Sequence, residues 1–156
     1  MKKPTLIILV ILAVAAALVA SFLVYRSTLG GSELSSARSR WQTANIAHYR
    51  YNLNVSCFCA FVERMPLAIE VQDGRVLSMQ YKDGTPVSAE ERQMFASYET
   101  LDKLFDFTAE SQQKADSIKI AYDSTYGFPS SVEIDFIQQA ADDELYLYVT
   151  GFQQLP

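Results

Sequence analysis

The sequence predicts an α+β fold, in which an antiparallel sheet of about six strands carries helices on one face and a single transmembrane helix precedes the sheet. Three observations lead to this fold class. Residues 6–25 form an apolar run without a charged side chain. Several short segments further along alternate apolar and polar residues, as half-buried strands do. The expected elements follow in the order α-β-β-β-α-β-β-β, which lacks the strand–helix alternation of parallel sheets.

The apolar run predicts a transmembrane signal anchor, because a helix needs roughly 20 apolar residues to cross the hydrocarbon core of a membrane. The expected organisation is a tail of residues 1–5, the anchor at residues 6–25, a flexible linker of residues 26–36 and one domain of residues 37–156. A cleaved signal peptide stays the alternative, since two lysines precede the run. Basic residues on both sides of the run leave its orientation undecided.

The first element of the domain is expected to be a helix. Ser32, or Ser35 and Ser36 slightly later, can cap its N-terminus. Apolar residues then recur at three- and four-residue spacing, and Trp41 among them is the expected core anchor. The helix should therefore lie on the sheet through this apolar stripe.

The segment His48–Cys59 predicts the first strand, because apolar and polar residues alternate strictly from Tyr49 to Cys57. Tyrosine, leucine and valine occupy one parity, whereas arginine, asparagine and serine occupy the other. A strand with one buried face and one solvated face is therefore expected here.

Residues 67–71 and 75–81 predict the next two strands, joined at Asp73-Gly74. A two-residue turn at this pair would place Ile69 opposite a serine. A three-residue loop with a bulge instead pairs Ile69 with Leu77 and buries apolar against apolar side chains. The three-residue loop is therefore the predicted connection.

The second half of the chain predicts two helical segments and three strands. Ser88 and Glu91 form a capping box, and Thr100 can cap the helical segment that follows. The three strands are expected at residues 118–122, 132–136 and 145–149.

The polar residues of the alternating segments predict a second sheet face without helices. Asn52, Asn54, Tyr146 and Tyr148 are the candidate binding surface on this face, because tyrosine combines apolar area with a hydrogen-bonding tip. Cross-strand packing of tyrosines on a solvated face explains the same pattern. The sequence leaves both interpretations open.

Cys57 and Cys59 are the candidate disulfide or redox pair. On a strand their α-carbons would lie about 6.6 Å apart, so a bond between them needs a local kink and would be readily reduced. Zinc would need four ligands, and His48 has the wrong strand parity to join the two thiolates. Copper(I) accepts fewer soft ligands and stays an alternative, but no metal site and no cofactor are predicted.

Composition and motifs argue against several classes of function. The chain has one histidine, no Gly-x-Ser-x-Gly elbow and no glycine-rich phosphate loop, so no catalytic residues are predicted. Its formal net charge is −5, with acidic residues concentrated between Glu99 and Glu144. Nucleic acid is therefore not an expected partner, since phosphate binding needs a clustered basic surface.

Several motifs cover most of the chain from Trp41 to Phe152. They are Trp41, Tyr49-x-Tyr51, Cys57-x-Cys59, Asp73-Gly74-x-Val76, Thr100-Leu101 with Leu104-Phe105, and the run from Tyr122-Asp123 through Gly127-Phe-Pro129 to Ile134-Asp135. Together they resemble an uncharacterised bacterial family of small exported or lipid-anchored domains of unknown function. The resemblance implies a cytoplasmic N-terminus, a single pass through the cell membrane and an extracytoplasmic domain. It implies no particular reaction.

These observations predict a membrane-anchored extracytoplasmic protein of the bacterial cell envelope, which acts as a non-catalytic binding or assembly module with a protein partner. The alternative is a thiol redox or copper-handling protein that acts through Cys57 and Cys59. A third hypothesis is an inhibitor that binds a basic partner through the acidic second half of the chain.

Overall fold

The computed structural model describes the backbone of residues 3–140 and 142–156. The side chains of residues 3–10, 22–30 and 32 lie outside the described ones. The chain divides into two compact units between Ser35 and Ser36.

Helix α1 extends from Lys3 to Ala44, and the next residue, Asn45, has a left-handed backbone conformation with φ of 49°. Asparagine tolerates this conformation better than most residues, which makes it a common residue just after a helix. Residues 26–36, expected as a flexible linker, belong to α1, so the serines in this stretch do not start a helix. Glycines there weaken a helix without ending it, because the backbone hydrogen bonds continue past them.

The membrane anchor expected at residues 6–25 is a wrong prediction. In the part of the chain that the structure describes, no helix is both long and apolar enough to cross a membrane. A crossing helix needs roughly 20 apolar residues in succession, and the described side chains of α1 form no such run. The expected membrane partner and the single-pass membrane localisation are corrected with it. The side chains of residues 1–10 and 22–25 lie outside the described ones.

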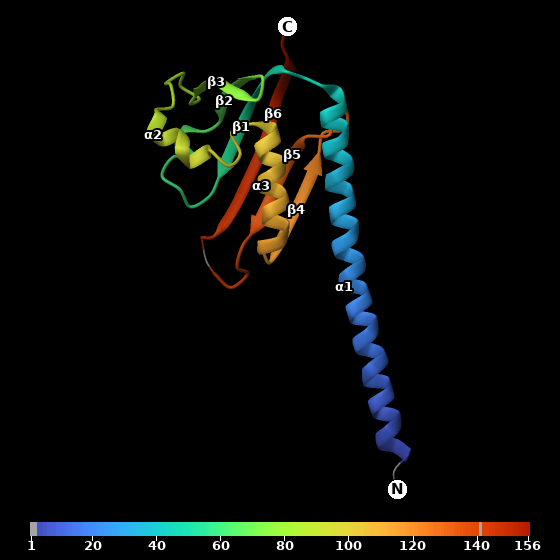
Figure 1. The fold of residues 1–156 in the computed structure, drawn as a ribbon. Coiled ribbons are helices and arrows are strands. Elements are labelled where there is room, and N and C mark those ends of the chain that lie inside the picture. Colours follow the sequence, from blue (N-terminus) through green and yellow to red (C-terminus); the bar gives the residue numbers. More distant parts are fainter. Residues whose placement is uncertain (1–2, 141) are drawn as a thin grey trace. The chain divides into compact units, whose positions relative to one another are not determined.

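Six antiparallel strands form one sheet in the order β3-β2-β1-β6-β5-β4. The strands are β1 (His48–Ser56), β2 (Leu67–Gln72), β3 (Arg75–Gln80), β4 (Ser117–Tyr122), β5 (Pro129–Asp135) and β6 (Glu144–Gln154). Two three-stranded meanders therefore lie side by side, with β1 and β6 paired at the centre (Figure 1). The predicted α+β class with a six-stranded antiparallel sheet is confirmed.

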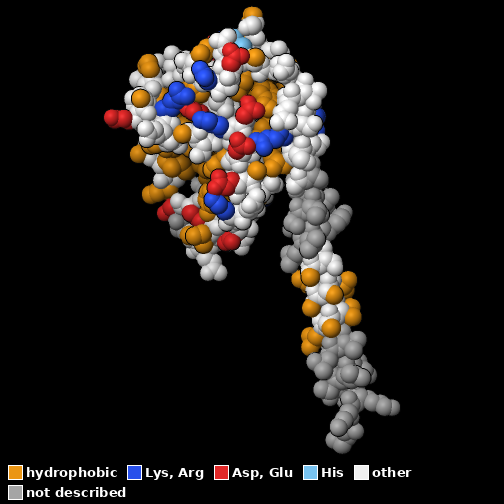
Figure 2. All heavy atoms as spheres, in the orientation of Figure 1, with side chains coloured by type: hydrophobic (Ala, Val, Ile, Leu, Met, Phe, Trp, Pro, Cys, Tyr) orange, Lys and Arg blue, Asp and Glu red, His pale blue; other side chains and the backbone are white. Residues whose placement is uncertain are grey.

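The helical segments of the second unit lie on one face of this sheet, with α3 running across it (Figure 1). They are the 3₁₀ helix η1 (Val62–Arg64), α2 (Ala89–Arg92), the 3₁₀ helix η2 (Gln93–Phe95) and α3 (Leu101–Lys114). The capping box predicted at Ser88 and Glu91 is present, and the Thr100 hydroxyl accepts a hydrogen bond from the Lys103 amide. Figure 2 shows lysine, arginine, aspartate and glutamate side chains interspersed on the helix-covered side.

The β2–β3 hairpin differs from the predicted register. Asp73 and Gly74 both have positive φ, 51° and 73°, and form a two-residue turn between Gln72 and Arg75. The register then shifts within the hairpin, so that Ile69 pairs with Met79 and the Leu77 side chain is 56% exposed. The bulge reconciles the turn that Asp-Gly favours with burial of apolar residues on both strands, which a regular hairpin could not do.

The core lies between the sheet and the helices. Alternate residues of β1, β2, β5 and β6 are buried, as are Leu104 and Phe105 of α3. Trp41, at the C-terminal end of α1, is 4% exposed and packs edge-on against Tyr49 and Phe128. The interpretation of Trp41 as a core anchor is therefore confirmed.

Candidate functional site

The face of the sheet opposite the core is polar, and none of the helical segments of the second unit lies on it (Figure 1). We call it the open face. Its side chains are exposed or half-buried and come from every strand: Arg50, Asn52 and Asn54 of β1, Glu70 of β2, Ser78 and Gln80 of β3, Lys119 of β4, Ser131, Glu133 and Asp135 of β5, and Tyr146, Tyr148 and Thr150 of β6. Strict alternation along the strands places them together, because neighbouring residues of a strand point to opposite faces.

The structure brings the four candidate binding residues together at the centre of the open face. Asn54 pairs directly with Tyr148, while Asn52 and Tyr146 lie on the same two strands one step to either side. All four side chains are half-buried. Burial, followed by the nearby carboxylate of Glu133, raises the pKa of Tyr148, so its hydroxyl stays protonated at neutral pH and can donate a hydrogen bond.

A hollow of about 400 Å³ opens on this face beside Asn52. The β1–β6 register shifts between Arg50 and Asn52, and Gly151 opposite them has φ of +62°. A Cβ atom at Gly151 would lie 2.9 Å from Asn52 Nδ2, so the glycine leaves room for the asparagine amide. The bulge thus opens the hollow, which is lined in part by Arg50, Glu70, Gln80 and Gln153.

Sequence reasoning missed this hollow. The alternation of apolar and polar residues predicts which side chains share a face, but nothing in it shows where two strands separate. The one available signal was Gly151, since an isolated glycine inside a strand often marks a bulge. Pockets for small molecules are mostly apolar, whereas this hollow is polar and open.

A smaller hollow of about 180 Å³ lies on the other side of the tyrosines, across β4, β5 and β6. Lys119, Glu133, Asp135, Glu144 and Tyr146 contribute to its lining. Desolvation, with the negative charges of neighbouring acidic residues, raises the pKa of Asp135. The open face therefore offers two polar depressions with asparagine and tyrosine side chains between them.

His48 stands at the end of the open face that carries Glu70. Its Nδ1 lies 2.9 Å from the Pro156 carbonyl oxygen and its Nε2 lies 2.8 Å from Glu70 Oε1. Both partners are acceptors, so this arrangement favours the charged imidazole, which can donate from both ring nitrogens. The hydrogen bond to Pro156, and then the one to Glu70, raise the pKa of His48 above its ordinary value of 6.5.

This geometry predicts a pH dependence of stability. Because the folded-state pKa of His48 is raised, its contribution is fully present below about pH 6.5 and is lost as pH rises through the folded-state value. The chain has one histidine, so a proton NMR titration of the imidazole reports this pKa without ambiguity. The midpoint of this titration is expected above pH 6.5, and the loss of stability with rising pH should be absent from the His48→Gln variant. A midpoint below 6.5 would contradict the stabilisation of the charged imidazole by Pro156 and Glu70.

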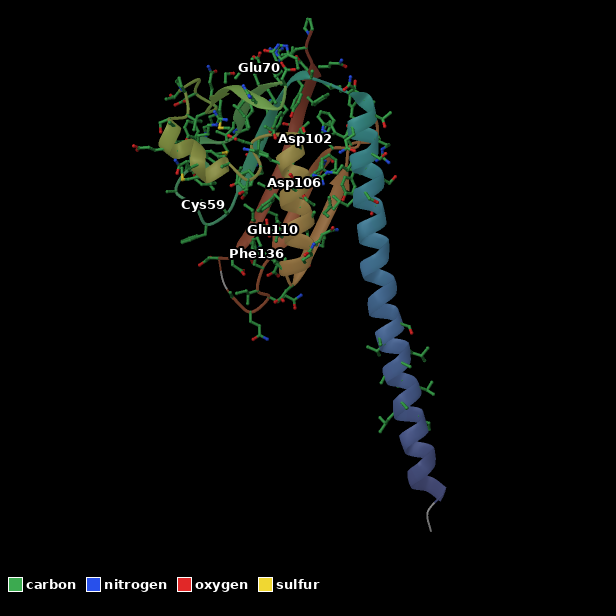
Figure 3. The ribbon with its side chains drawn as sticks, in the orientation of Figure 1. Cys59, Glu70, Asp102, Asp106, Glu110 and Phe136 are labelled. Carbon is green, nitrogen blue, oxygen red and sulfur yellow. A yellow bond between two sulfur atoms is a disulfide. The ribbon has the colours of Figure 1, made fainter. Side chains whose placement is uncertain are left out.

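The structure joins Cys57 and Cys59 in a disulfide, with their α-carbons 5.2 Å apart. This separation is shorter than the roughly 6.6 Å expected on a strand, because β1 ends at Ser56 and both cysteines lie in the loop that follows. In the disulfide neither sulfur is a thiolate that could ligate copper. Figure 3 shows Cys59 in this loop, apart from Glu70. A redox role for the pair stays a prediction.

No group of three or more histidine, cysteine, aspartate or glutamate side chains is placed to hold a metal ion among the described residues. The acidic side chains of α3 instead have local partners. Asp102 accepts a hydrogen bond from Trp41, and Asp106 pairs with Arg38 (Figure 3). These contacts hold α3 to the end of α1 and belong to the fold rather than to a binding site.

Comparison with known proteins identifies one family. The model of a family of unknown function, DUF6174, matches residues 33–154. This match confirms that the chain carries an uncharacterised domain. No curated protein and no solved structure matches the chain.

Proposed function

This chain belongs to DUF6174, a family of unknown function, and we propose that its domain is a non-catalytic binding module that recognises a protein partner through the open face. The observation that carries this proposal is the uncovered, polar and tyrosine-bearing centre of the sheet. The opposite face of the sheet carries the buried residues of the core. A role in the bacterial cell envelope stays a prediction.

The chemistry of the open face fits a protein segment better than a small molecule. Amide, guanidinium and tyrosine side chains present both donors and acceptors, which match a peptide backbone and its polar side chains. Tyrosine adds apolar contact area at a small cost in conformational entropy, and both tyrosine and arginine are enriched in protein interfaces. The two polar hollows on either side of Tyr146 would receive side chains of the bound segment.

The face also lacks the arrangement that catalysis needs. Both ring nitrogens of His48 are already engaged, by the Pro156 carbonyl and by Glu70, so neither is free to serve a substrate as a general base. Lys119 and Glu133 are cross-strand partners of opposite charge, and not the pair of acids with separated pKa values that acid–base catalysis uses. Binding without chemistry is therefore the function that this geometry supports best.

The test compares matched substitutions on the two sides of the sheet. Asn54→Asp and Gln113→Glu both exchange an amide for a carboxylate, the first on the open face and the second on the exposed side of α3. The tagged full chain is captured from the cells that express it, and the recovered proteins are quantified against wild type. We expect Asn54→Asp, alone and with Tyr148→Ser, to lower recovery of a specific partner by about tenfold or more.

Gln113→Glu should leave that recovery unchanged. The same partner, once purified, should bind the wild-type chain and bind the open-face variants more weakly in titration calorimetry. Equal recovery by wild type and both open-face variants, with unchanged melting curves, would remove the open face from consideration as the binding surface.

A further inference from the structure

Arg50 and Glu70 are direct cross-strand neighbours on the open face, but they do not pair with each other. The register of β1 and β2 places one opposite the other. Opposite charges in this arrangement ordinarily attract each other across a sheet. Among the described residues, however, no carboxylate forms an ion pair with Arg50. The positive charge of this arginine is therefore left without an acidic partner.

Each of the two side chains is held by another residue instead. Arg50 Nε and Nη2 both donate to Gln153 Oε1 of β6, at 2.8 and 2.5 Å, and Glu70 Oε1 lies 2.8 Å from His48 Nε2. Strands β6 and β2 flank β1 on opposite sides, so the bonds to Gln153 draw the guanidinium away from Glu70. Arg50 and Glu70 both line the hollow of about 400 Å³, which we call the larger hollow.

The bonds to Gln153 orient the guanidinium and leave part of it available. A guanidinium carries five N–H donors in one plane. Gln153 occupies the edge formed by Nε and Nη2. The end formed by Nη1 and Nη2 keeps two parallel N–H groups, which is the arrangement that a carboxylate accepts with its two oxygens. An arginine already held in place also loses less side-chain freedom on binding.

The remaining lining of the larger hollow is compatible with a bound anion. Arg50 is its only basic residue and Glu70 its only acidic one. Because His48 is hydrogen-bonded to Glu70, Arg50 is the one charged group of this lining without an ionisable partner. Asn52 and Gln80 add amide N–H donors to the same hollow.

We propose that the larger hollow binds an acidic side chain, aspartate or glutamate, of the protein segment that lies on the open face, with its carboxylate against the free end of Arg50. This inference rests on the function proposed above and names what the partner presents at one place. Charge complementarity selects the occupant, because a carboxylate matches both the charge and the paired donors of the arginine. The smaller hollow has the opposite balance, one lysine with three acidic residues, so the two hollows together would fix the direction of the bound segment.

The first measurement is a selection of displayed peptides on the full chain. The random peptides have about 12 residues, enough to cross a sheet of six strands, and their C-termini are fused to a carrier. Peptides that lose binding to Asn54→Asp with Tyr148→Ser are retained as ligands of the open face. We expect aspartate or glutamate to be enriched at one position of these peptides. Selection on Arg50→Glu should replace them there by lysine or arginine.

The second measurement uses one selected peptide, synthesised with the acidic residue and with its amide counterpart. Against the wild-type chain this exchange should weaken affinity by about tenfold, and against Arg50→Gln by less than about twofold. Arg75→Gln is the matched control, because Arg75 is exposed at the start of β3 outside the larger hollow, and it should keep the tenfold difference. Gln153→Ala keeps the charge but releases the guanidinium, and should also weaken binding of the acidic peptide. Melting curves show whether each variant stays folded.

Open-face peptides without a preferred acidic position would overturn this inference and leave the proposed function in place. An equal effect of the acid-to-amide exchange on wild type and Arg50→Gln would do the same. Peptides made with free and with amidated C-termini identify the source of the carboxylate, and binding that requires the free terminus would also contradict an acidic side chain. If no selected peptide depends on Asn54 and Tyr148, the proposed function itself is contradicted.

Discussion

Replacing Trp41 by alanine is expected to lower the free energy of unfolding by about 3–5 kcal/mol. The side chain is 4% exposed, and its ring packs edge-on against three aromatic rings, those of Tyr49, Phe128 and Phe152, at centroid distances of 5.3, 6.0 and 6.0 Å. Alanine would leave a cavity at the place where α1 meets both central strands. Edge-on pairs of aromatic rings add to the loss from burial.

Two further variants separate the contributions of Trp41. Trp41→Phe keeps an aromatic ring but loses the hydrogen bond of 3.1 Å from the indole nitrogen to Asp102 Oδ1, and is expected to cost about 1–2 kcal/mol. Gln42→Ala, at an exposed neighbouring position of the same helix, should change stability by less than about 0.5 kcal/mol. Urea denaturation of the full chain measures all three. A Trp41→Ala loss no larger than that of Gln42→Ala would mean that this end of α1 is not packed on the sheet.

Gly127→Ala is expected to cost about 3 kcal/mol or more, from two causes acting together. Gly127 has φ of +86°, a conformation that strains any residue with a Cβ atom. A Cβ there would also lie 2.4 Å from the carbonyl oxygen of Ala37 in α1, which is backbone and cannot move aside cheaply. The turn between β4 and β5 must therefore shift away from the helix.

Gly84→Ala is the matched control for this second prediction. Gly84 has nearly the same backbone conformation, with φ of +82°, but a Cβ atom added there would have no atom within 4 Å beyond its chain neighbours. It should cost only the backbone strain, about 1–2 kcal/mol. The difference between the two variants in thermal or urea denaturation therefore measures how closely α1 and the β4–β5 turn approach. Equal losses would show that this approach contributes nothing to stability.

Both predictions concern the packing of the last turns of α1 on the core side of the sheet, opposite the open face. Trp41 and Ala37 belong to the last turns of α1, and both contact the region where β5 and β6 lie against the core. Tyr148 and Asn54 are presented by the other side of these central strands. Variants of Trp41 or Gly127 that remain folded are therefore useful controls for effects on partner binding that act through the sheet.

Alternation in the sequence was sufficient to find every strand and to separate the core face from the open face. The reason is local, since a two-residue period in polarity forces one parity of a strand into the core. The same alternation predicts that Asn52, Asn54, Tyr146 and Tyr148 share one surface of the sheet. Capping at Ser88 and Thr100 was equally readable, because a cap uses residues within one helical turn.

Features that depend on contacts distant in sequence could not be read in this way. The predicted register of β2 and β3 was wrong. The two strands accommodate both the Asp-Gly turn and the apolar pairing through a bulge, which exposes Leu77. The prediction of a flexible linker at residues 26–36 was wrong, because α1 continues through them. Serine and glycine indicate the end of a helix only where no helical hydrogen bonds continue beyond them. The apolar run at the start of the chain was interpreted as a membrane anchor from its composition alone, which the described helices do not support.

The local pattern of residue types thus specified the secondary structure, the two faces of the sheet and the class of fold, since each is set by neighbours a few residues apart. Long-range packing specified the hollow beside Gly151 and the close approach of Gly127 to α1. These arise where segments far apart in sequence compete for the same space or the same hydrogen bonds. That competition is resolved only when the whole chain is folded.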